Sequence, residues 1–370
     1  MKILLAAGLY LPDIGGPATY ASMLSRELPQ EGIEVVVLPY GTVRHVHKLG
    51  RHLVYTFRLW QHSHDVNLIY ALDPMSVGLP ARLVAMFRRV PLVVRLGGDY
   101  AWEQGVQRFG VLGTLDEYTN RTCARPLAVR VLAAVQGWVT RGAKRVIVPS
   151  EYLKSIVATW GVPVKNISVL YSAVEPITVS ADCTTLREDF NFTNPTIVSV
   201  GRLTPWKGFR TVIDVVALRK ARGENTTLVI AGSGPEEAVL KTYAESKGVN
   251  DEVRFVGALT QDALFAVIKA ADVFVLNTAY EGLSHQLLEV MSIGIPIITT
   301  PVGGNPELIT DGVEGRLVDV NDTVAFDAAI STLLADEKMQ RDYVTAARSR
   351  SESFSASAAV EKIVATLKNI

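Results

Sequence analysis

The stretch Ala271-Asp-Val-Phe-Val-Leu276, followed by Glu281-Gly-Leu-Ser-His-Gln-Leu-Leu-Glu289, decides the fold of this chain. The first part is an apolar run typical of a buried β-strand. The second opens at a Gly-containing turn and predicts a helix that continues through Ile293. A strand, a short loop and a helix form the repeating unit of an α/β fold. Backbone N–H groups and the helix dipole converge at the start of such a helix, so this loop is a candidate binding site.

Two carboxylates, Glu281 and Glu289, stand eight positions apart in this stretch. They would repel a bare phosphate, so we expect them to contact hydroxyl groups. Eight helical residues rise about 12 Å, which is close to the span from the sugar to the ribose of an extended nucleotide-sugar. We therefore predict that Glu281 meets a sugar and Glu289 a ribose. The alternative is a pair of solvated acids on a helix surface.

A second predicted strand runs into two cations, in Ile197-Val-Ser-Val-Gly-Arg202-Leu-Thr-Pro-Trp-Lys207-Gly208. The guanidinium of Arg202 matches phosphate oxygens as a planar fork, and Lys207 supplies a compact charge. The glycines beside them allow the backbone to approach a ligand closely. These cations are candidate diphosphate ligands; the alternative is that they only cap a loop.

A third predicted strand ends in the glycine-rich turn Gly232-Ser-Gly-Pro235. Taken alone, this turn is a weak signal. Three strand ends with polar or glycine-rich turns in one segment are stronger, because open α/β sheets bind ligands at the carboxyl ends of their strands. Gly232 and Gly234 are therefore added to the candidate site.

The chain resembles the retaining glycosyltransferases of glycosyltransferase family 4. The residues that carry this resemblance are Gly15-Gly16, Arg202, Lys207, Gly232-Ser-Gly-Pro235, Glu281, Glu289 and Pro301-Val-Gly-Gly-Asn-Pro-Glu-Leu-Ile309. The resemblance implies the GT-B architecture, an α/β fold in which two Rossmann-like parallel-sheet domains face a cleft and a C-terminal helix packs back on the first domain. It also implies retention of the anomeric configuration.

The same resemblance implies a role for each of the site residues. Arg202 and Lys207 would stabilise the diphosphate leaving group, assisted by backbone amides at Gly282, Leu283 and Ser284 and by Gly15 and Gly16 from the other domain. Fixed cations aimed at developing negative charge can replace a divalent metal. No Asp-x-Asp triplet occurs in the chain, so we expect no metal and no cofactor beyond a donor such as a UDP- or GDP-sugar.

The chain departs from the family pattern in the first domain. Many members carry a His at the end of a first-domain strand, whereas this chain reads Val93-Val-Arg-Leu-Gly-Gly-Asp-Tyr-Ala-Trp-Glu103. Arg95, Asp99 or Glu103 could take over the sugar or acceptor contacts, and Asp99 is the preferred catalytic candidate. An Asp that only caps the next helix is the alternative. His285 is a weaker candidate for a sugar contact.

Length and element pattern predict two domains. A chain of 370 residues exceeds what one core usually supports. Strands such as the one expected over 2–7 alternate with helices such as those expected over 17–30, 48–62 and 127–141. This alternation indicates one parallel-sheet domain over residues 1–173 and another over 174–354, with the linker near Pro176. Residues 355–370 show helical apolar spacing and would form the returning C-terminal helix.

Composition excludes several classes of protein. The chain is 48% hydrophobic and 20% charged, which fits a globular enzyme rather than a disordered chain. Its net charge is zero, unlike that of strongly basic nucleic-acid binders. No apolar run reaches the roughly 20 residues of a membrane span. Cys123 and Cys183 suggest no disulfide framework and suit a reducing compartment, so we expect a cytoplasmic protein.

The two halves of the chain differ in charge. Residues 1–180 carry 19 Lys and Arg against 12 Asp and Glu, whereas residues 181–370 carry 18 against 25. The cations, histidines and apolar residues of 44–64 could form a basic amphipathic helix that lies on an anionic membrane surface. The alternative is an ordinary surface helix.

The predicted function is transfer of a sugar from a nucleotide-diphosphate sugar to a glycan, a lipid-linked molecule or a small-molecule acceptor. Alternatives are a GT-B epimerase, a GT-B phosphorylase or a non-catalytic partner subunit. An epimerase would convert donor without acceptor, and a phosphorylase would need inorganic phosphate. A Rossmann dehydrogenase is disfavoured because no Gly-x-Gly-x-x-Gly follows a strand in the required context.

Overall fold

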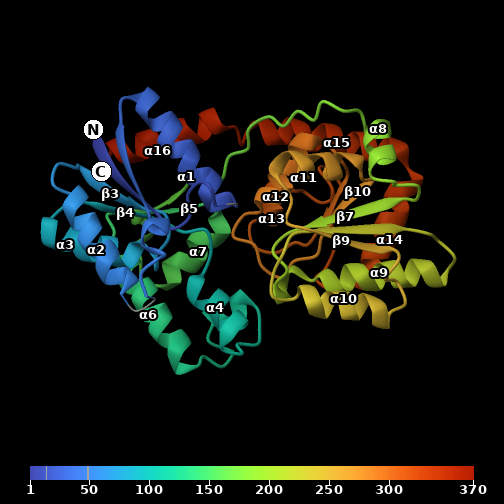
Figure 1. Ribbon diagram of the computed structural model, residues 1–370, viewed down its shortest axis with the longest axis horizontal. Helices are drawn as coiled ribbons and strands as arrows, with labels where there is room; N and C mark the ends of the chain where they lie inside the picture. The colour runs from blue at the N-terminus through green and yellow to red at the C-terminus, as the bar shows by residue number, and fades with distance from the viewer. Residues whose placement is uncertain (14, 48–49) are drawn as a thin grey trace. The chain divides into compact units, whose positions relative to one another are not determined.

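The computed structural model describes residues 1–13, 15–47 and 50–370 and contains two α/β units, each built on a six-stranded sheet (Figure 1). Met1–Ser172 together with Ala356–Ile370 form unit 1, and Ala173–Ser355 form unit 2. Two parallel sheets of this kind, each covered by helices, make up the GT-B architecture. The last segment of the chain therefore packs within unit 1.

The sheet of unit 1 is parallel and has the order β2-β1-β3-β4-β5-β6. Leu4 of the second strand in this order, β1, pairs with Val36 on one side and with Ile69 on the other. The strands are apolar and mostly buried because helices cover both faces of such a sheet. Their bounds are β1 Lys2–Ala7, β2 Glu34–Pro39, β3 Leu68–Ala71, β4 Leu92–Arg95, β5 Arg145–Val148 and β6 Ile167–Val169.

The helices of unit 1 form two layers. Helix α16 packs against α1 and η1, and Figure 1 shows α16 beside α1. On the other face α2 packs against α3, and α3 packs against α6, as expected for right-handed crossovers from β2 onward. The bounds are α1 Gly16–Glu27, η1 Leu28–Glu31, η2 Tyr40–Val43, α2 Arg51–His62, α3 Gly78–Arg88, α4 Tyr100–Arg108, α5 Leu115–Thr119, α6 Leu127–Arg141, α7 Glu151–Thr159, η3 Val164–Asn166 and α16 Ala356–Lys368.

The sheet of unit 2 is also parallel and has the order β12-β11-β10-β7-β8-β9. Its core joins strand residues such as Ile197 and Val275 to Val216 of α9 and Phe326 of α14. The strands are β7 Thr196–Val200, β8 Thr227–Ala231, β9 Val253–Gly257, β10 Val273–Leu276, β11 Ile297–Thr299 and β12 Arg316–Leu317.

The helices of unit 2 cover both faces of its sheet. Figure 1 shows α11, α12 and α15 on one side of the strands and α9 and α10 on the other. Helix α14 packs against α9, and α15 packs against α12. The bounds are α8 Cys183–Asp189, η4 Pro205–Lys207, α9 Phe209–Ala221, α10 Glu237–Ser246, α11 Gln261–Ala270, α12 His285–Ile293, α13 Asn305–Leu308, α14 Thr323–Ala335 and α15 Glu337–Glu352.

Some elements differ from the sequence expectations. The helix expected over 17–30 ends at Glu27, and a 3-10 turn containing Pro29 follows, because proline cannot donate the next helical hydrogen bond. The helix expected over 48–62 begins at Arg51, with Gly50 as its N-cap, and residues 48–49 lie outside the described residues. Short elements such as β6, α5 and α8 were not predicted, because three to seven residues carry little periodicity.

Candidate functional site

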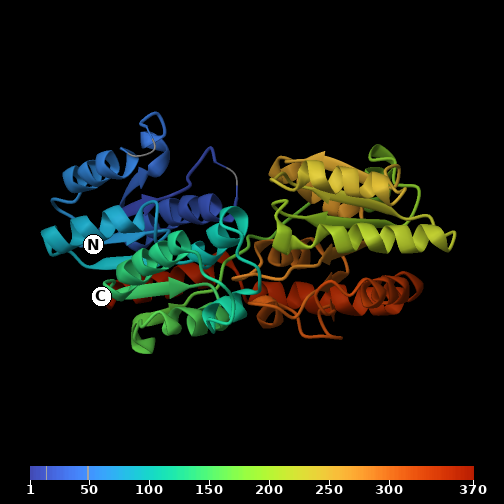
Figure 2. The ribbon, with the colours of Figure 1, turned by 90° about the horizontal axis from the view of Figure 1, so that it is seen from below.

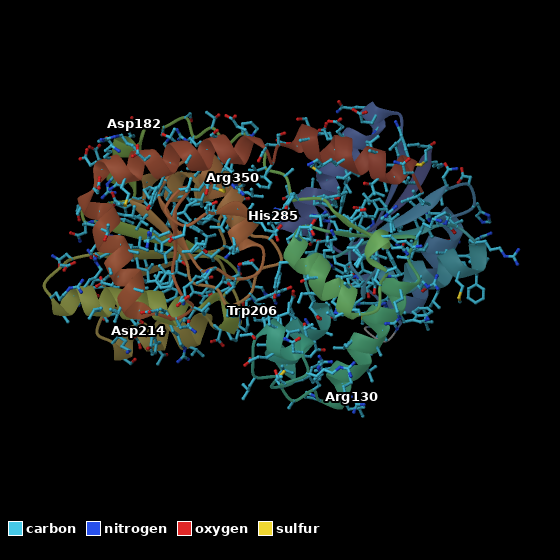
Figure 3. All side chains as sticks on the ribbon, turned by 180° about the vertical axis from the view of Figure 1, so that it is seen from behind. Arg130, Asp182, Trp206, Asp214, His285 and Arg350 are labelled. Atoms are coloured by element: carbon cyan, nitrogen blue, oxygen red, sulfur yellow. The ribbon has the colours of Figure 1, made fainter. Side chains whose placement is uncertain are left out.

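The loops after four strands of unit 2 meet at the carboxyl edge of its sheet. The loop after β7 is joined to the loop after β8 by the Gly201 amide, which donates to Ala231 O at 3.0 Å, and by the Leu203 amide, which donates to Ser233 O at 3.1 Å. Trp206, from the segment after β7, and His285, the first residue of α12, lie at the same end of unit 2 in Figure 3. The structure therefore brings the predicted strand-end motifs of unit 2 together.

An ion pair between Lys207 and Glu281 lies at the centre of these loops. The ammonium of Lys207, in η4, contacts Glu281 Oε1 across 74 residues of sequence. The two side chains are 10% and 12% exposed. Removing one partner of such a largely buried pair leaves an uncompensated charge and costs about 3–5 kcal/mol. The pair therefore holds one candidate cation and one candidate acid in fixed positions.

Glycines allow the loops to approach one another closely. Gly232 has a φ of +134°, and a Cβ at this position would collide with Gly201 O. A Cβ on Gly234 would lie 2.6 Å from Leu203 N and 2.8 Å from Leu203 C. Both positions therefore exclude any side chain. These distances show that the two glycines pack against the loop that contains Arg202. Their predicted contact with a ligand stays a prediction.

Two asparagines that the sequence analysis did not single out connect the same loops. The Asn277 amide group donates to Gly208 O and to Asn321 Oδ1, each at 2.9 Å. Asn277 Oδ1 in turn accepts from the Asn321 backbone amide at 2.9 Å. Asn277 directly follows β10, and its side chain is buried. A polar residue at the end of a predicted strand was the only signal for it in the sequence.

The helix α12 begins later than the sequence analysis assumed. Glu281 and Gly282 lie in a loop, Ser284 is the N-cap, and the Ser284 hydroxyl accepts from the Leu287 amide at 3.3 Å. Serine stabilises a helix N-terminus as its N-cap, whereas glycine disfavours helical conformation, so the helix begins after Ser284 and not at Gly282. The estimated rise of eight helical residues from Glu281 to Glu289 was therefore wrong, because only Glu289 lies within the helix.

Glu289 is half-buried on α12, and its carboxyl group forms no hydrogen bond or ion pair within the described part of the chain. Burial alone raises the pKa of its carboxyl group to about 7. Groups with strongly perturbed pKa values cluster at functional sites. Glu289 is therefore a candidate for contact with a polar ligand group.

Arg202 differs from Lys207 in its surroundings. Its side chain is exposed, and its guanidinium pairs with no carboxylate among residues 1–13, 15–47 and 50–370. Arg202 lies on the same loop as Lys207, five positions before it. The structure thus holds one candidate cation in an ion pair and leaves the other accessible to an anion.

Asp99 serves as the N-cap of α4. Its Oδ1 accepts from the Trp102 amide at 3.0 Å and from Gln136 Nε2 at 3.1 Å, and the side chain is buried. Burial raises the pKa of its carboxyl group, and these hydrogen bonds oppose that rise. This geometry is that of the helix-capping alternative. Nearby Arg95 is also buried and stacks on Tyr20, with its guanidinium carbon 3.7 Å from the ring centroid.

Gly15 and Gly16 lie in unit 1, before and at the start of α1. Gly15 has a φ of +130° and is the N-cap of α1, and Gly16 is its first residue. The Ala18 amide donates to Gly15 O at 2.9 Å. Both glycines are thus at a helix N-terminus, where backbone N–H groups can meet an anion.

Within the described residues, no group of three or more His, Cys, Asp and Glu side chains is arranged to hold a metal ion. Among the same residues, no helix is long and apolar enough to span a bilayer.

Two family models match adjoining parts of the chain. Residues 15–173 match the model described as "Glycosyl transferase 4-like domain", and residues 184–350 match "Glycosyl transferases group 1". Over its full length the chain is 24% identical to the N-acetyl-alpha-D-glucosaminyl L-malate synthase of Bacillus anthracis, covering 97% of that protein. It is 26% identical to the glycogen synthase of Mycobacterium tuberculosis, with coverage of 95% and 90%.

A further relative matches over a shorter span. The lipopolysaccharide core biosynthesis glycosyltransferase LpsE of Rhizobium meliloti is 34% identical over 40% of this chain and 41% of its own length. Among solved structures, HepE of Anabaena in complex with UDP-glucose matches with a TM-score of 0.80 at 21% identity, covering both chains fully. Sucrose-phosphate synthase of Thermosynechococcus elongatus matches with a TM-score of 0.81 at 19% identity, with coverage of 100% and 98%. At these identities the two structures show the fold alone.

Proposed function

This chain belongs to glycosyltransferase family 4 and is a nucleotide-sugar glycosyltransferase, and on that premise we propose a retaining, metal-independent transfer. The donor in this proposal is a UDP- or GDP-sugar, and the acceptor is a glycan, a lipid-linked molecule or a small molecule. The similar HepE structure contains UDP-glucose, and a mannosyltransferase of Mycolicibacterium smegmatis, 33% identical over 39% of this chain, is named GDP-mannose-dependent. These names support both bases for the donor.

The observation that carries the proposal is the largely buried Lys207–Glu281 ion pair. Breaking the bond between the anomeric carbon and the phosphate oxygen places negative charge on the diphosphate and positive charge on the sugar. A fixed ammonium stabilises the leaving group, and most strongly where water is excluded. In the proposal Lys207 and the exposed Arg202 meet the diphosphate, and Glu281 meets the sugar.

Glu289 has a separate role in the proposal, at the ribose. Its half-buried carboxylate lacks a partner in the described structure, and ribose hydroxyls would donate the hydrogen bonds that it lacks. Such bonds favour the ionised form and would offset its cost of burial. The amides at the start of α12 would add further donors to the diphosphate.

Metal independence rests on charge. Arg202 and Lys207 together supply two positive charges, which is the charge that a divalent cation would bring to a diphosphate. The sequence also lacks an Asp-x-Asp triplet. Retention of configuration rests on the resemblance to the family.

The test is an activity screen with purified protein. UDP- and GDP-sugars are incubated with candidate acceptors, with and without a chelator, and the released nucleotide and the linkage of the product are measured. We expect acceptor-dependent release that the chelator leaves unchanged and a product with the anomeric configuration of the donor. Release lost on chelation, an inverted product, or conversion of donor without acceptor would contradict the respective part of the proposal.

A further inference from the structure

Three neighbouring helices of unit 1 form one continuous outer layer. Helix α2 packs against α3, and α3 packs against α6. Seen from below in Figure 2, the three helices follow one another across this face, in colours from blue to green. Their inner faces are buried against the sheet, through residues such as Leu59, Val84 and Val139. We call this surface the α2–α3–α6 layer.

The outer face of the layer exposes many large apolar side chains. Leu53, Phe57 and Trp60 follow one another at helical spacing on α2, so they lie on one side of that helix. The exposed fractions are Leu53 75%, Phe57 61% and Trp60 39% on α2, Met86 46% and Phe87 69% on α3, and Leu127 72%, Val131 53% and Trp138 37% on α6. Soluble monomers rarely gather so many on adjacent elements, which indicates an interaction surface.

The same layer is positively charged. The three helices contain six arginines and no Asp or Glu. Within the described residues, the guanidinium groups of these arginines contact carbonyl oxygens, a histidine and aromatic rings. None of them forms an ion pair with a carboxylate there. Examples are Arg58 Nη1 to Thr42 O at 3.3 Å and Arg141 Nη1 to Trp160 O at 2.7 Å. The charge of the layer is therefore not neutralised from within the protein.

Arginine–tryptophan stacking joins the helices. The guanidinium of Arg88 on α3 stacks on Trp60 of α2, 3.7 Å from the ring centroid. Arg82 of α3 lies 5.4 Å from the ring centroid of Trp138 on α6 and donates to Gly142 O at 3.0 Å. Tryptophan and arginine are the side chains that combine apolar burial with contact to phosphate groups at a bilayer surface.

We propose that the α2–α3–α6 layer docks on an anionic phospholipid surface. The apolar side chains would enter the boundary between headgroups and acyl chains, and the arginines would contact lipid phosphates. Charge complementarity selects this partner, because a layer without carboxylates repels cations and attracts an anionic surface. The layer extends beyond residues 44–64, which the sequence analysis singled out. Within that stretch Arg44 is already neutralised by Asp13, at 2.6 Å, and Lys48 lies outside the described residues.

The experiment is flotation of the purified full-length protein with two kinds of vesicle, phosphatidylcholine alone and phosphatidylcholine with phosphatidylglycerol. We expect flotation only with the anionic vesicles, and less of it at high salt because screening weakens the attraction. One double variant combines Arg58→Gln on α2 with Arg130→Gln on α6; Arg130 is labelled in Figure 3. It should lower partitioning of the protein onto the anionic vesicles about 25-fold. This assumes about fivefold per charge near the surface. Leu53→Ser together with Phe57→Ser should lower partitioning by at least about tenfold.

Matched variants separate docking from general charge and exposure. Lys362→Gln with Lys368→Gln removes the same charge from exposed positions of α16, and Val313→Ser with Val324→Ser changes exposed apolar residues of unit 2. Both controls should float like the wild type. Circular dichroism and nucleoside diphosphate binding confirm that each variant is folded.

Several results would overturn the proposal. These are no flotation with anionic vesicles, equal flotation with neutral vesicles, or equal loss in the matched controls. If sedimentation shows that the wild type is a dimer and that Leu53→Ser with Phe57→Ser makes it a monomer, the layer would instead bind a second copy of the chain. Because nucleoside diphosphate binding is measured independently, failure of docking leaves the proposed transfer reaction standing.

Discussion

Replacing Glu289 with Gln should stabilise the protein at neutral pH and leave its stability unchanged in acid. Burial raises the pKa of Glu289 in the folded protein from 4.5 to about 7. Each pKa unit corresponds to about 1.4 kcal/mol, so the ionised carboxylate costs the folded state about 3 kcal/mol. Glutamine has a similar shape and carries no charge, so it avoids this cost.

The direction of the pH dependence follows from the two pKa values. Below pH 4.5 the carboxyl group is protonated in both the folded and the unfolded state, and burial costs little. Between pH 4.5 and about 7 the unfolded chain loses its proton while the folded protein keeps it, so the wild type becomes progressively less stable. Above about pH 7 the full cost is present.

The measurement is the free energy of unfolding in urea, followed by circular dichroism from acid to mildly alkaline pH. The difference between Glu289→Gln and the wild type should grow from near zero to about 3 kcal/mol across this range. Glu361→Gln, at an exposed position of α16, serves as the control and should show no such growth. A difference that does not change with pH, or a wild type more stable than the variant at alkaline pH, would refute the reasoning.

Three further predictions concern the same site. Lys207→Ala and Glu281→Ala should each lower the rate of transfer by at least about a hundredfold while circular dichroism stays native, and near-normal turnover in either would remove the pair from the mechanism. Affinity for free nucleoside diphosphate should rise about tenfold more from pH 6 to pH 8 in the wild type than in Glu289→Gln, because the ligand's own phosphate titrates equally in both experiments; calorimetry that finds equal slopes would argue against the ribose contact. Gly232→Ala should destabilise the protein by about 2–4 kcal/mol because of the collision with Gly201 O, whereas Gly248→Ala, which has open space around it, should cost about 1 kcal/mol in urea unfolding; equal losses would show that the close approach is unimportant.

Much of the fold follows from the sequence because strands and helices leave periodic patterns. The strand at Lys2–Ala7 and the helix at Leu127–Arg141 were predicted with the observed bounds. Local competition was harder to foresee. Whether α12 begins at Gly282 or at His285 depends on Ser284 acting as an N-cap, and the apolar pattern of the helix is the same in both cases.

The candidate site was predictable by its types of residue but not by its contacts. From the sequence we expected Lys207 to meet a phosphate and Glu281 a sugar, and no pattern indicated that the two form an ion pair across 74 residues. Contacts between loops of different strands depend on the register of the sheet and on close approaches such as that of Gly232 to Gly201. These are properties of the folded backbone, which a local pattern does not encode.

The Lys207–Glu281 pair has a consequence for the order in which a ligand's parts are recognised. A free monosaccharide would have to draw Glu281 away from an ammonium that water reaches poorly, and it offers no anion in return. A pyrophosphate group supplies that replacement anion and so releases the acid for the carbohydrate. We expect detectable monosaccharide binding only when nucleoside diphosphate is present, and calorimetric titration in both conditions would reveal any exception. The enzyme would thereby ignore the abundant free sugars around it and respond to the activated form.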